Sequence, residues 1–227
     1  MLMAALGMLL PGCETDSNVT GPSVLTGSSN NVVMASGTLT TQVRAVSGFT
    51  AVAIDVPGLV TIEPGNLDSL TITGDEAVVS AITSEVRDGE LSISLPENTD
   101  PRLNGLDEIE YQVTVRDLRG LRVNGIARVV ATEFDTPQFD VNINGVSIVS
   151  ASGRAERQNV FVSGTSRYEA QNLISREVTV DVSGVAMAFL NVSETLKGQV
   201  SGAGLVEYAG NPTVSVTASE AGSVTPR

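Results

Sequence analysis

Two glutamates, Glu108 and Glu110, come nearest to forming a catalytic pair in this chain. They lie two positions apart in an alternating segment, so a strand would place both carboxylates on one face, roughly 6.5–7 Å apart. That separation is at the low edge of the range that inverting glycoside hydrolases use. Alternating acids are also common on the solvent face of a strand in a chain this acidic. The pair keeps a polysaccharide-acting enzyme as an alternative function, and the rest of the sequence favours a non-catalytic one.

The composition removes most other routes to catalysis. The 227 residues include no His and no Trp, and aromatic residues make up only 4%. Without His there is no imidazole to act as a general base or to activate a nucleophile. A zinc site lacks its usual ligands, because the chain has one Cys, and the sequence contains no EF-hand calcium loop. We therefore expect no catalytic residue, no metal and no cofactor.

The charge of the chain argues against a nucleic-acid partner. Lys and Arg number 13 against 26 Asp and Glu, which gives a formal net charge of −13 and a pI near 4.3. Phosphate backbones are bound by clustered basic residues, and the basic residues here are few and scattered. Charge-driven binding to an anionic membrane surface is disfavoured for the same reason.

The single cysteine, Cys13, follows an apolar stretch that ends in Leu10-Pro11-Gly12. This string resembles a bacterial lipobox, in which the cysteine receives diacylglycerol and anchors the mature protein to a membrane. We expect residues 1–12 to be a lipoprotein signal peptide, whose missing basic residues indicate a true start further upstream. Residues 13–36, rich in Ser, Asn, Thr and Gly, would form a lipidated flexible tether. The expected location is the bacterial cell envelope, lipid-anchored at the outer membrane or at a periplasmic membrane face, with the membrane and the face left open.

The elements that must position any site come from a repeat in the second half of the chain. Short Val-rich runs lead into six corners that each pair a small residue with Gly, and successive glycines are separated by 20, 19, 20, 18 and 20 residues. The corners are Asn124-Gly125, Asn144-Gly145, Ser163-Gly164, Ser183-Gly184, Ser201-Gly202 and Ala221-Gly222. A fixed period near twenty, with period-two alternation between corners, predicts stacked coils of short strands. We therefore expect an all-β, right-handed parallel β-helix-like solenoid with coils of about 20 residues, filling residues 37–227 as a single domain.

Alternation also predicts which side chains point into the solenoid. The positions expected to face inward are Val123, Val141, Ile143, Val160, Val162, Val178, Val180, Val182, Val200 and Val216. Before the repeat, one or two helical turns are expected over Asp75–Thr83, and Asp88-Gly89 predicts a tight hairpin between residues 85 and 95. The polar segment Pro96–Asp107 is expected to be a loop. The first part of the domain would then be irregular coils of the same solenoid.

Few aromatic residues are available for binding. We expect Phe134, Phe139, Phe161 and Phe189 to pack in the core or between coils. Tyr168 and Tyr208 are the candidates for a surface binding face, because a tyrosine hydroxyl favours a wet environment.

The motifs assembled so far resemble a bacterial family, the "putative auto-transporter adhesin, head GIN domain". The matching segments are Gly48-Phe49 with the alternating strand after it, Thr73-Gly74-Asp75-Glu76, Asp88-Gly89-Glu90-Leu91-Ser92-Ile93, Leu121-Arg122-Val123-Asn124-Gly125, the Ser-Gly repeats, Ser201-Gly202-Ala203-Gly204 and Val206-Glu207-Tyr208-Ala209-Gly210-Asn211-Pro212. The resemblance covers roughly residues 37–227. It departs at Ala221-Gly222, where a Ser-Gly pair would be expected, and at Ile126, where the family usually places a small residue. It implies a right-handed parallel β-helix-like fold presented as an envelope lipoprotein, and it supplies no catalytic residues.

The sequence therefore predicts a non-catalytic envelope lipoprotein that acts as a binding or adhesion-like scaffold module. A glycan or an envelope or surface protein is the candidate partner, and the membrane is contacted through the lipid anchor. A purely structural envelope protein and a polysaccharide-acting enzyme stay open as alternatives. The oligomeric state is open as well.

Overall fold

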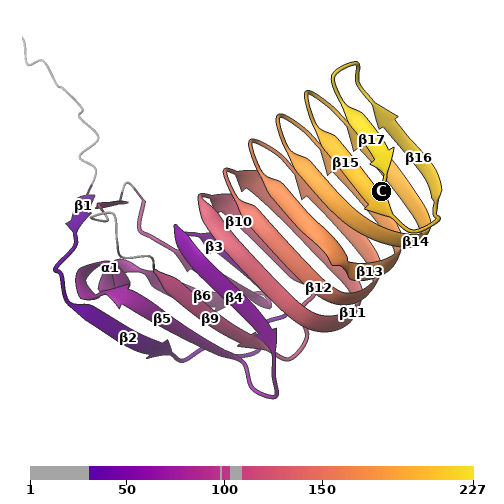
Figure 1. Ribbon diagram of the computed structural model, residues 1–227. Helices are drawn as coiled ribbons and strands as arrows, with labels where there is room; N and C mark the ends of the chain where they lie inside the picture. Colours follow the sequence, from indigo (N-terminus) through magenta and orange to yellow (C-terminus); the bar gives the residue numbers. More distant parts are fainter. Residues whose placement is uncertain (1–30, 98, 103–108) are drawn as a thin grey trace, which may run out of the picture.

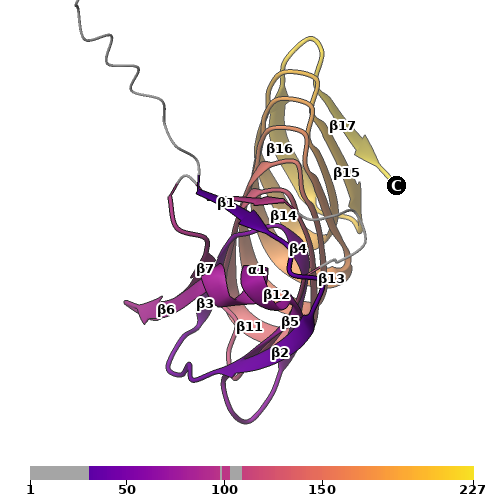
Figure 2. The same cartoon turned by 90° about the vertical axis from the view of Figure 1, so that its left-hand side faces the viewer.

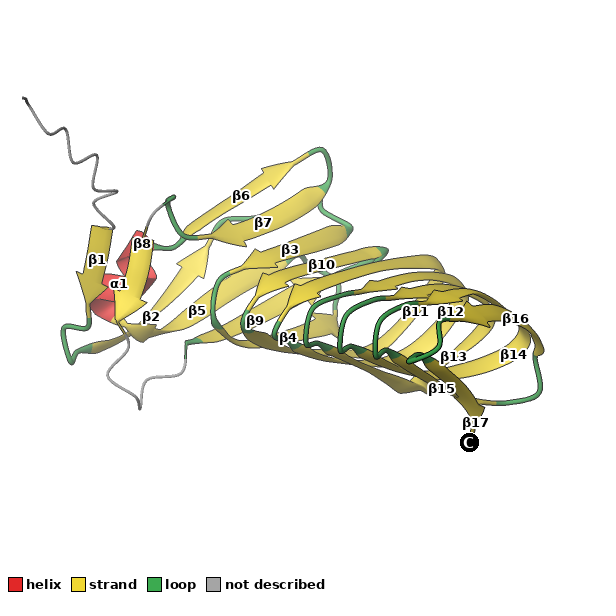
Figure 3. Ribbon diagram, turned by 90° about the horizontal axis from the view of Figure 1, so that it is seen from above, coloured by secondary structure: helices red, strands yellow, loops and turns green. Residues whose placement is uncertain are grey.

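The computed structural model describes residues 31–97, 99–102 and 109–227. Within them the chain forms strands almost throughout, with one short helix near the N-terminal end (Figure 3). In chain order the elements are β1 (Asn31–Met34), β2 (Leu39–Arg44), β3 (Ala51–Asp55), β4 (Gly58–Pro64), β5 (Ser69–Asp75), α1 (Glu76–Ala81), β6 (Thr83–Arg87), β7 (Glu90–Ser94), β8 (Thr99–Arg102), β9 (Glu110–Val115), β10 (Gly120–Gly125), β11 (Ala127–Gly145), β12 (Ile148–Val162), β13 (Arg167–Val182), β14 (Met187–Val200), β15 (Leu205–Ala209), β16 (Thr213–Ala218) and β17 (Ser223–Pro226).

Parallel pairing of successive strands builds the solenoid (Figure 1). The long strands β11 to β14 pair in order, each in parallel with the next. The first half of β11 pairs with β4 and its second half with β10, so one long strand contributes to both sides of a flattened coil. β15 and β16 continue the two sides beyond β14. A view turned by 90° shows the outlines of these coils nested one behind another (Figure 2).

Alternation places one apolar row per strand position between the two sides. Val141, Val160 and Val180 lie in register and are buried, and Val123, Ile143 and Val162 form the next buried row. Stacked β-branched side chains pack well on a pleated surface, and removing them from water is the main favourable term of the fold. Every position expected to point inward is buried, except Val216 in the last coil, which is half-buried and packs against the core.

From the second corner onward, stacking on the coil before requires glycine at Gly145, Gly164, Gly184 and Gly202. Gly145 has a φ of 118°, and a Cβ on it would lie 2.4 Å from the carbonyl oxygen of Gly125 in the coil before. Gly164 and Gly184 meet the preceding corner glycine in the same way, at 2.4 and 2.7 Å. Only a residue without Cβ fits where two backbones approach so closely at positive φ. The glycines that repeat in the sequence therefore stack on one another from coil to coil in the structure.

At the bend opposite the corners, bulges absorb the variation in coil length. The pairing of β11 with β12 shifts register between Ala131 and Phe134, and Glu133 within this gap has a φ of 56°. The pairings of β12 with β13 and of β13 with β14 shift at the same bend. Inserted residues of this kind bend a strand without breaking its pairing on either side. Coils of 18 to 20 residues can thus share one stack.

The N-terminal part departs from regular coils. β5 pairs antiparallel with both β2 and β9, although the sheet around them is parallel. The predicted hairpin is confirmed: β6 pairs antiparallel with β7 through Asp88 and Gly89, whose φ values are 51° and 80°. The predicted helical turns are confirmed as α1, whose N-cap Asp75 accepts a hydrogen bond from the Ala77 N–H.

Two expectations at this end were wrong in detail. The tether was expected to run to Ser36, but Asn31–Met34 form β1. β1 pairs in parallel with β8, which lies inside the segment expected to be only a loop. The predicted fold class, an all-β parallel solenoid with coils of about 20 residues, is confirmed.

Candidate functional site

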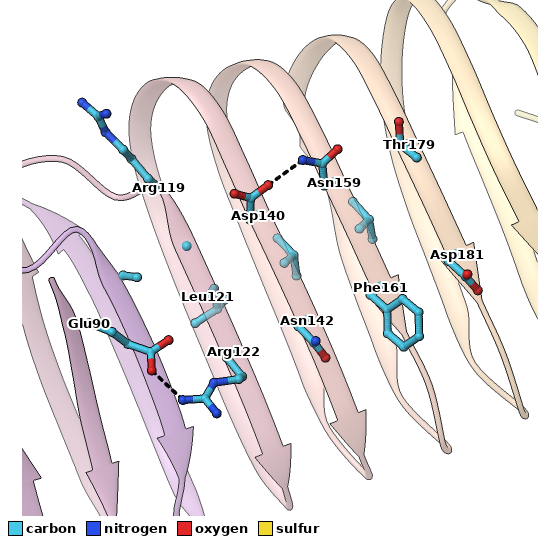
Figure 4. A pocket seen from close by; sticks show the side chains of 14 residues that line it. Glu90, Arg119, Leu121, Arg122, Asp140, Asn142, Asn159, Phe161, Thr179 and Asp181 are labelled. Carbon is cyan, nitrogen blue, oxygen red and sulfur yellow. Dashed lines mark hydrogen bonds and ion pairs between the residues drawn. The ribbon is translucent and has the colours of Figure 1, made fainter. Parts of the chain in front are cut away.

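A hollow of about 560 Å³ lies on the outer face of the sheet, over β7, β3, β10, β11, β12 and β13 (Figure 4). We call it the outer-face hollow. It is lined by Ala51, Glu90, Arg119, Gly120, Leu121, Arg122, Asp140, Val141, Asn142, Asn159, Val160, Phe161, Thr179 and Asp181. Its volume falls within the range of about 300–1,000 Å³ that is usual for ligand pockets.

The depth of the hollow comes from two small residues in neighbouring strands. Ala51 and Gly120 are paired in register, so the sheet has almost no side-chain volume at this point. A Cβ on Gly120 would lie 2.9 Å from the Cβ of Ala51, closer than side chains approach. Gly120 is therefore needed at the bottom of the hollow, because any side chain there would clash with Ala51. Its missing side chain leaves the backbone accessible from outside.

The polar rim is held by contacts between strands. Arg122 donates a hydrogen bond to Glu90 at 2.5 Å and forms an ion pair with it across β3. Asp140 accepts hydrogen bonds from the Asn159 amide at 2.6 Å and from the Gln138 amide at 3.0 Å. Side chains that are fixed before a ligand arrives lose less conformational entropy when it binds.

Phe161 is the apolar member of the rim, and the residue is 44% exposed. It lies in an outward row between Asn142 of β11 and Asp181 of β13, so polar side chains flank it on both sides. Figure 4 shows its ring between the side chains of Asn142 and Asp181. An exposed aromatic face among fixed polar groups is a typical feature of a recognition surface.

The charged side chains of the hollow carry a small excess of negative charge. Arg119 and Arg122 line it together with Glu90, Asp140 and Asp181. Asp117, just outside the hollow, pairs with Arg119 at 2.5 Å, and this hydrogen bond raises the pKa of the guanidinium. The Asp181 carboxylate accepts a hydrogen bond from the Gln199 amide at 2.5 Å. Both arginines are thus paired with a carboxylate, and Asp140 and Asp181 are each held by an amide.

The structure corrects the candidate surface role of Tyr168. This side chain is fully buried in the inward row between Val149 and Ala188. Its hydroxyl donates a hydrogen bond of 2.8 Å to the side-chain oxygen of Gln158, which is itself buried. Gln158 thus gives the hydroxyl a polar partner inside the solenoid, where solvent was expected to be its partner. Burial raises the pKa of the Tyr168 phenol.

The other predicted residues do not meet at the hollow. Tyr208 is half-buried and packs against the core in the C-terminal coil, beside Leu190. Glu110 is exposed on β9, while its expected partner Glu108 lies outside the described residues. Cys13 also lies outside them, so its lipidation stays a prediction.

Sequence reasoning missed Phe161, Asn142 and Asp181, although a signal for them was present. Each sits between two residues that were correctly expected to point inward, such as Val160 and Val162 around Phe161. Alternation therefore places each of the three on the outer face. Phe161 was assigned to the core because of its residue type, against its position in the pattern.

The described residues contain no cluster of three or more His, Cys, Asp or Glu side chains that could hold a metal ion. In the same part of the chain, no helix has the length and apolar character needed to cross a membrane.

Three of the solved structures that resemble this chain share its fold. A putative adhesin from Bacteroides fragilis superposes with a TM-score of 0.70 at 22% identity, covering 86% of this chain and all of its own. A putative lipid binding protein from Parabacteroides distasonis (TM-score 0.56, 15% identity) covers 87% of this chain and all of its own. A putative adhesin from Parabacteroides merdae (TM-score 0.52, 16% identity) covers 87% of this chain and 99% of its own. At these identities the likeness concerns the fold.

No curated protein matches the chain. The family described as "Putative auto-transporter adhesin, head GIN domain" matches residues 48–212, most of the solenoid and of the N-terminal strands before it. The predicted resemblance is thereby confirmed, and the chain belongs to this family.

Proposed function

We propose that this protein is a non-catalytic, adhesion-like binding module of the bacterial cell envelope, and that the outer-face hollow receives its ligand. The observation that carries the proposal is the exposed Phe161 ring within a hollow whose polar rim is already held by hydrogen bonds. Exposed aromatic residues that are surrounded by fixed polar groups are common anchors of recognition. The names of the family and of two of the similar structures, which call them adhesins, support the same function.

The architecture suits a binding role because it holds the rim rigidly. The residues of the hollow come from six neighbouring strands, and backbone hydrogen bonds join each strand to the next. A preorganised surface avoids much of the ordering cost that weakens binding by flexible loops. The carboxylates of Glu90, Asp140 and Asp181 are engaged with an arginine or with amides. This arrangement favours fixed hydrogen-bond acceptors over a general acid and base.

The proposed location is the surface of an envelope membrane, with the domain anchored through lipid on Cys13. The support is the apolar run that ends in Leu10-Pro11-Gly12-Cys13, followed by a polar stretch. Metabolic labelling with a palmitate analogue, with the gene expressed from its native start, should mark the protein. Cys13→Ser should remove the label and release the protein from the membrane fraction. An unlabelled protein in the cytoplasm would contradict this location.

The binding function is tested on whole surfaces. Fluorescently labelled protein should bind saturably to bacterial or host cells in flow cytometry, and Phe161→Ala should lower that binding at least about tenfold. Ile174→Ala is the matched control, because Ile174 is 49% exposed on the neighbouring strand and does not line the hollow. Equal binding by all three proteins would place the binding surface elsewhere. Release of reducing ends from envelope or plant polysaccharides would favour the enzyme alternative.

A further inference from the structure

We propose that the outer-face hollow binds one uncharged polysaccharide chain, which lies along the solenoid axis with a sugar ring stacked on Phe161. This inference rests on the binding function proposed above, because it names the ligand class of the same site. Four features of the hollow carry it: its length, its aromatic ring, its hydrogen-bonding groups and the pairing of its charged side chains.

The shape of the hollow fits an extended chain. Its lining runs from Glu90 on β7 to Asp181 on β13, across strands ordered β7-β3-β10-β11-β12-β13. Five inter-strand steps of 4.7–4.9 Å give a length of about 24 Å along the stack. The hollow is thus long enough to hold several sugar units in a row.

The Phe161 ring supplies an apolar face where the rest of the rim is polar. Sugar rings carry C–H groups on their flat faces and hydroxyl groups around their edges, so they have apolar and polar sides at once. A ring stacked on Phe161 covers apolar surface that is now exposed, and its edge hydroxyls then face the neighbouring Asn142 and Asp181. A purely apolar ligand would instead remove water from these polar side chains without replacing their hydrogen bonds.

The polar groups offer both donors and acceptors, as hydroxyl groups require. Asn142 and Asn159 each carry an amide that can donate and accept, and Thr179 carries a hydroxyl. Asp140 and Asp181 accept bonds from amides and keep further lone pairs for a hydroxyl donor. In Figure 4 these groups lie in two rows along the hollow, with Asp140, Asn159 and Thr179 in one row.

The charge pattern favours a neutral chain over a charged one. The guanidinium of Arg122 is taken by Glu90 and that of Arg119 by Asp117, so a polyanion would have to displace an ion pair at each contact. The net charge of −13 opposes a polyanion further. Asp140 already accepts bonds from two amides, which leaves little room for the two-pronged contact of a guanidinium.

The test measures binding of purified neutral glycans to the full chain. An array of neutral oligosaccharides, including the cello-, xylo-, manno- and malto-series, is followed by calorimetry on the best hits from disaccharide to octasaccharide. We expect saturable binding. Its affinity should rise with the length of the oligosaccharide and level off once the outer-face hollow is filled. Phe161→Ala should weaken binding at least about tenfold and Asn142→Ala severalfold, while Ile174→Ala should leave it unchanged. All three changed residues are exposed, and unchanged circular dichroism and thermal midpoints will show that the variants are folded.

Three results would overturn the inference. They are the absence of binding to every neutral glycan, tighter binding to hexagalacturonate or to chitosan hexamer than to any neutral hexasaccharide, and equal affinity in Phe161→Ala. Cell-surface binding that depends on Phe161 but is not competed by neutral glycans would reject the polysaccharide and leave the binding function standing. If the protein bound neither cell surfaces nor neutral glycans, both the binding function and the polysaccharide ligand would be rejected.

Discussion

At the scale of single residues, the direction of a side chain across the sheet decides its role. Val180 points inward between Val160 and Gly198 and is fully buried, while its neighbour Thr179 is exposed on the outer face. The two residues are adjacent in sequence and lie on the same strand. The same substitution at both positions therefore separates burial from every other property of the strand.

Val180→Asp should destabilise the protein by about 3–5 kcal/mol or prevent folding, because it buries an unpaired carboxylate. Thr179→Asp should change the free energy of unfolding by no more than about 0.5 kcal/mol, because that carboxylate stays in water. Urea denaturation followed by circular dichroism measures both. Equal losses would mean that the strand register is wrong.

Residue type and residue position gave different answers for the aromatic side chains. Tyr168 was expected at the surface because of its hydroxyl, and Phe161 in the core because it is apolar. Their positions in the alternating pattern indicate the opposite: Phe161 lies between the inward Val160 and Val162, and Tyr168 lies between the charged Arg167 and Glu169. The structure agrees with position and not with residue type. What the sequence alone could not reveal is the hydrogen bond from Tyr168 to Gln158, since the two residues meet only across the interior of the solenoid.

At the scale of elements, the corners show why the glycine repeat was readable and the N-terminal part was not. A corner glycine is needed in four successive coils, at Gly145, Gly164, Gly184 and Gly202, because each repeats the close approach to the corner before it. That requirement leaves a periodic mark in the sequence. The antiparallel pairing of β5 with β2 and β9 leaves no such mark, because alternation is the same in parallel and antiparallel strands. The fold class was therefore predictable, and the local strand directions were not.

Gly125 and Gly145 allow the cost of stacking to be measured separately from the cost of backbone conformation. Both have positive φ, 97° and 118°, but a Cβ meets nothing within 4 Å at Gly125 and a carbonyl oxygen at 2.4 Å at Gly145. Gly125→Ala should lower stability by about 1–2 kcal/mol through backbone strain alone. Gly145→Ala should lower stability by about 1–3 kcal/mol more than Gly125→Ala does, because the added Cβ overpacks the corner. Equal losses by chemical denaturation would contradict the stacking explanation of the repeat.

The cap of α1 predicts a dependence of stability on pH. Asp75 accepts hydrogen bonds from the Ser36 and Gly37 segment and from Ala77, and these hold the pKa of its carboxyl below the usual value in spite of burial. A carboxyl whose pKa is lower in the folded state stabilises the fold above its unfolded pKa of about 3.9, and this contribution is lost as the pH falls through the folded value. The temperature at the midpoint of thermal unfolding should therefore decrease when the pH is lowered below about 4.

Asp75→Asn is the matched variant for this effect, since it keeps the size of the side chain and removes the charge. Its thermal midpoint should be lower than that of the wild type at pH 7, and the two curves should converge as the pH is lowered. Glu76→Gln, also at the start of α1, serves as the control for a general loss of charge. Parallel curves for Asp75→Asn and the wild type would show that the cap does not depend on ionisation.

At the scale of the whole molecule, stability should follow the stack of coils. In a solenoid each coil contacts only its neighbours, so a coil held on both sides is more stable than one held on a single side. β12 lies between β11 and β13, whereas β16 pairs with β14 alone among the described strands. Most side chains of β16 and β17 are exposed, while every second side chain along β12 and β13 is largely buried.

Hydrogen exchange followed by mass spectrometry should show this gradient directly. Peptides from β16 and β17 should exchange well before peptides from β11, β12 and β13, because the end coil can open without exposing the rest of the core. The outer-face hollow lies over β3, β7 and β10 to β13, so opening of the end coil should leave it intact. Ligand binding should accordingly slow exchange in β10 to β13 and leave β16 and β17 unchanged. Uniform exchange along the chain would mean that the molecule opens as one unit, and protection of β16 by a ligand would place the binding surface at the C-terminal end.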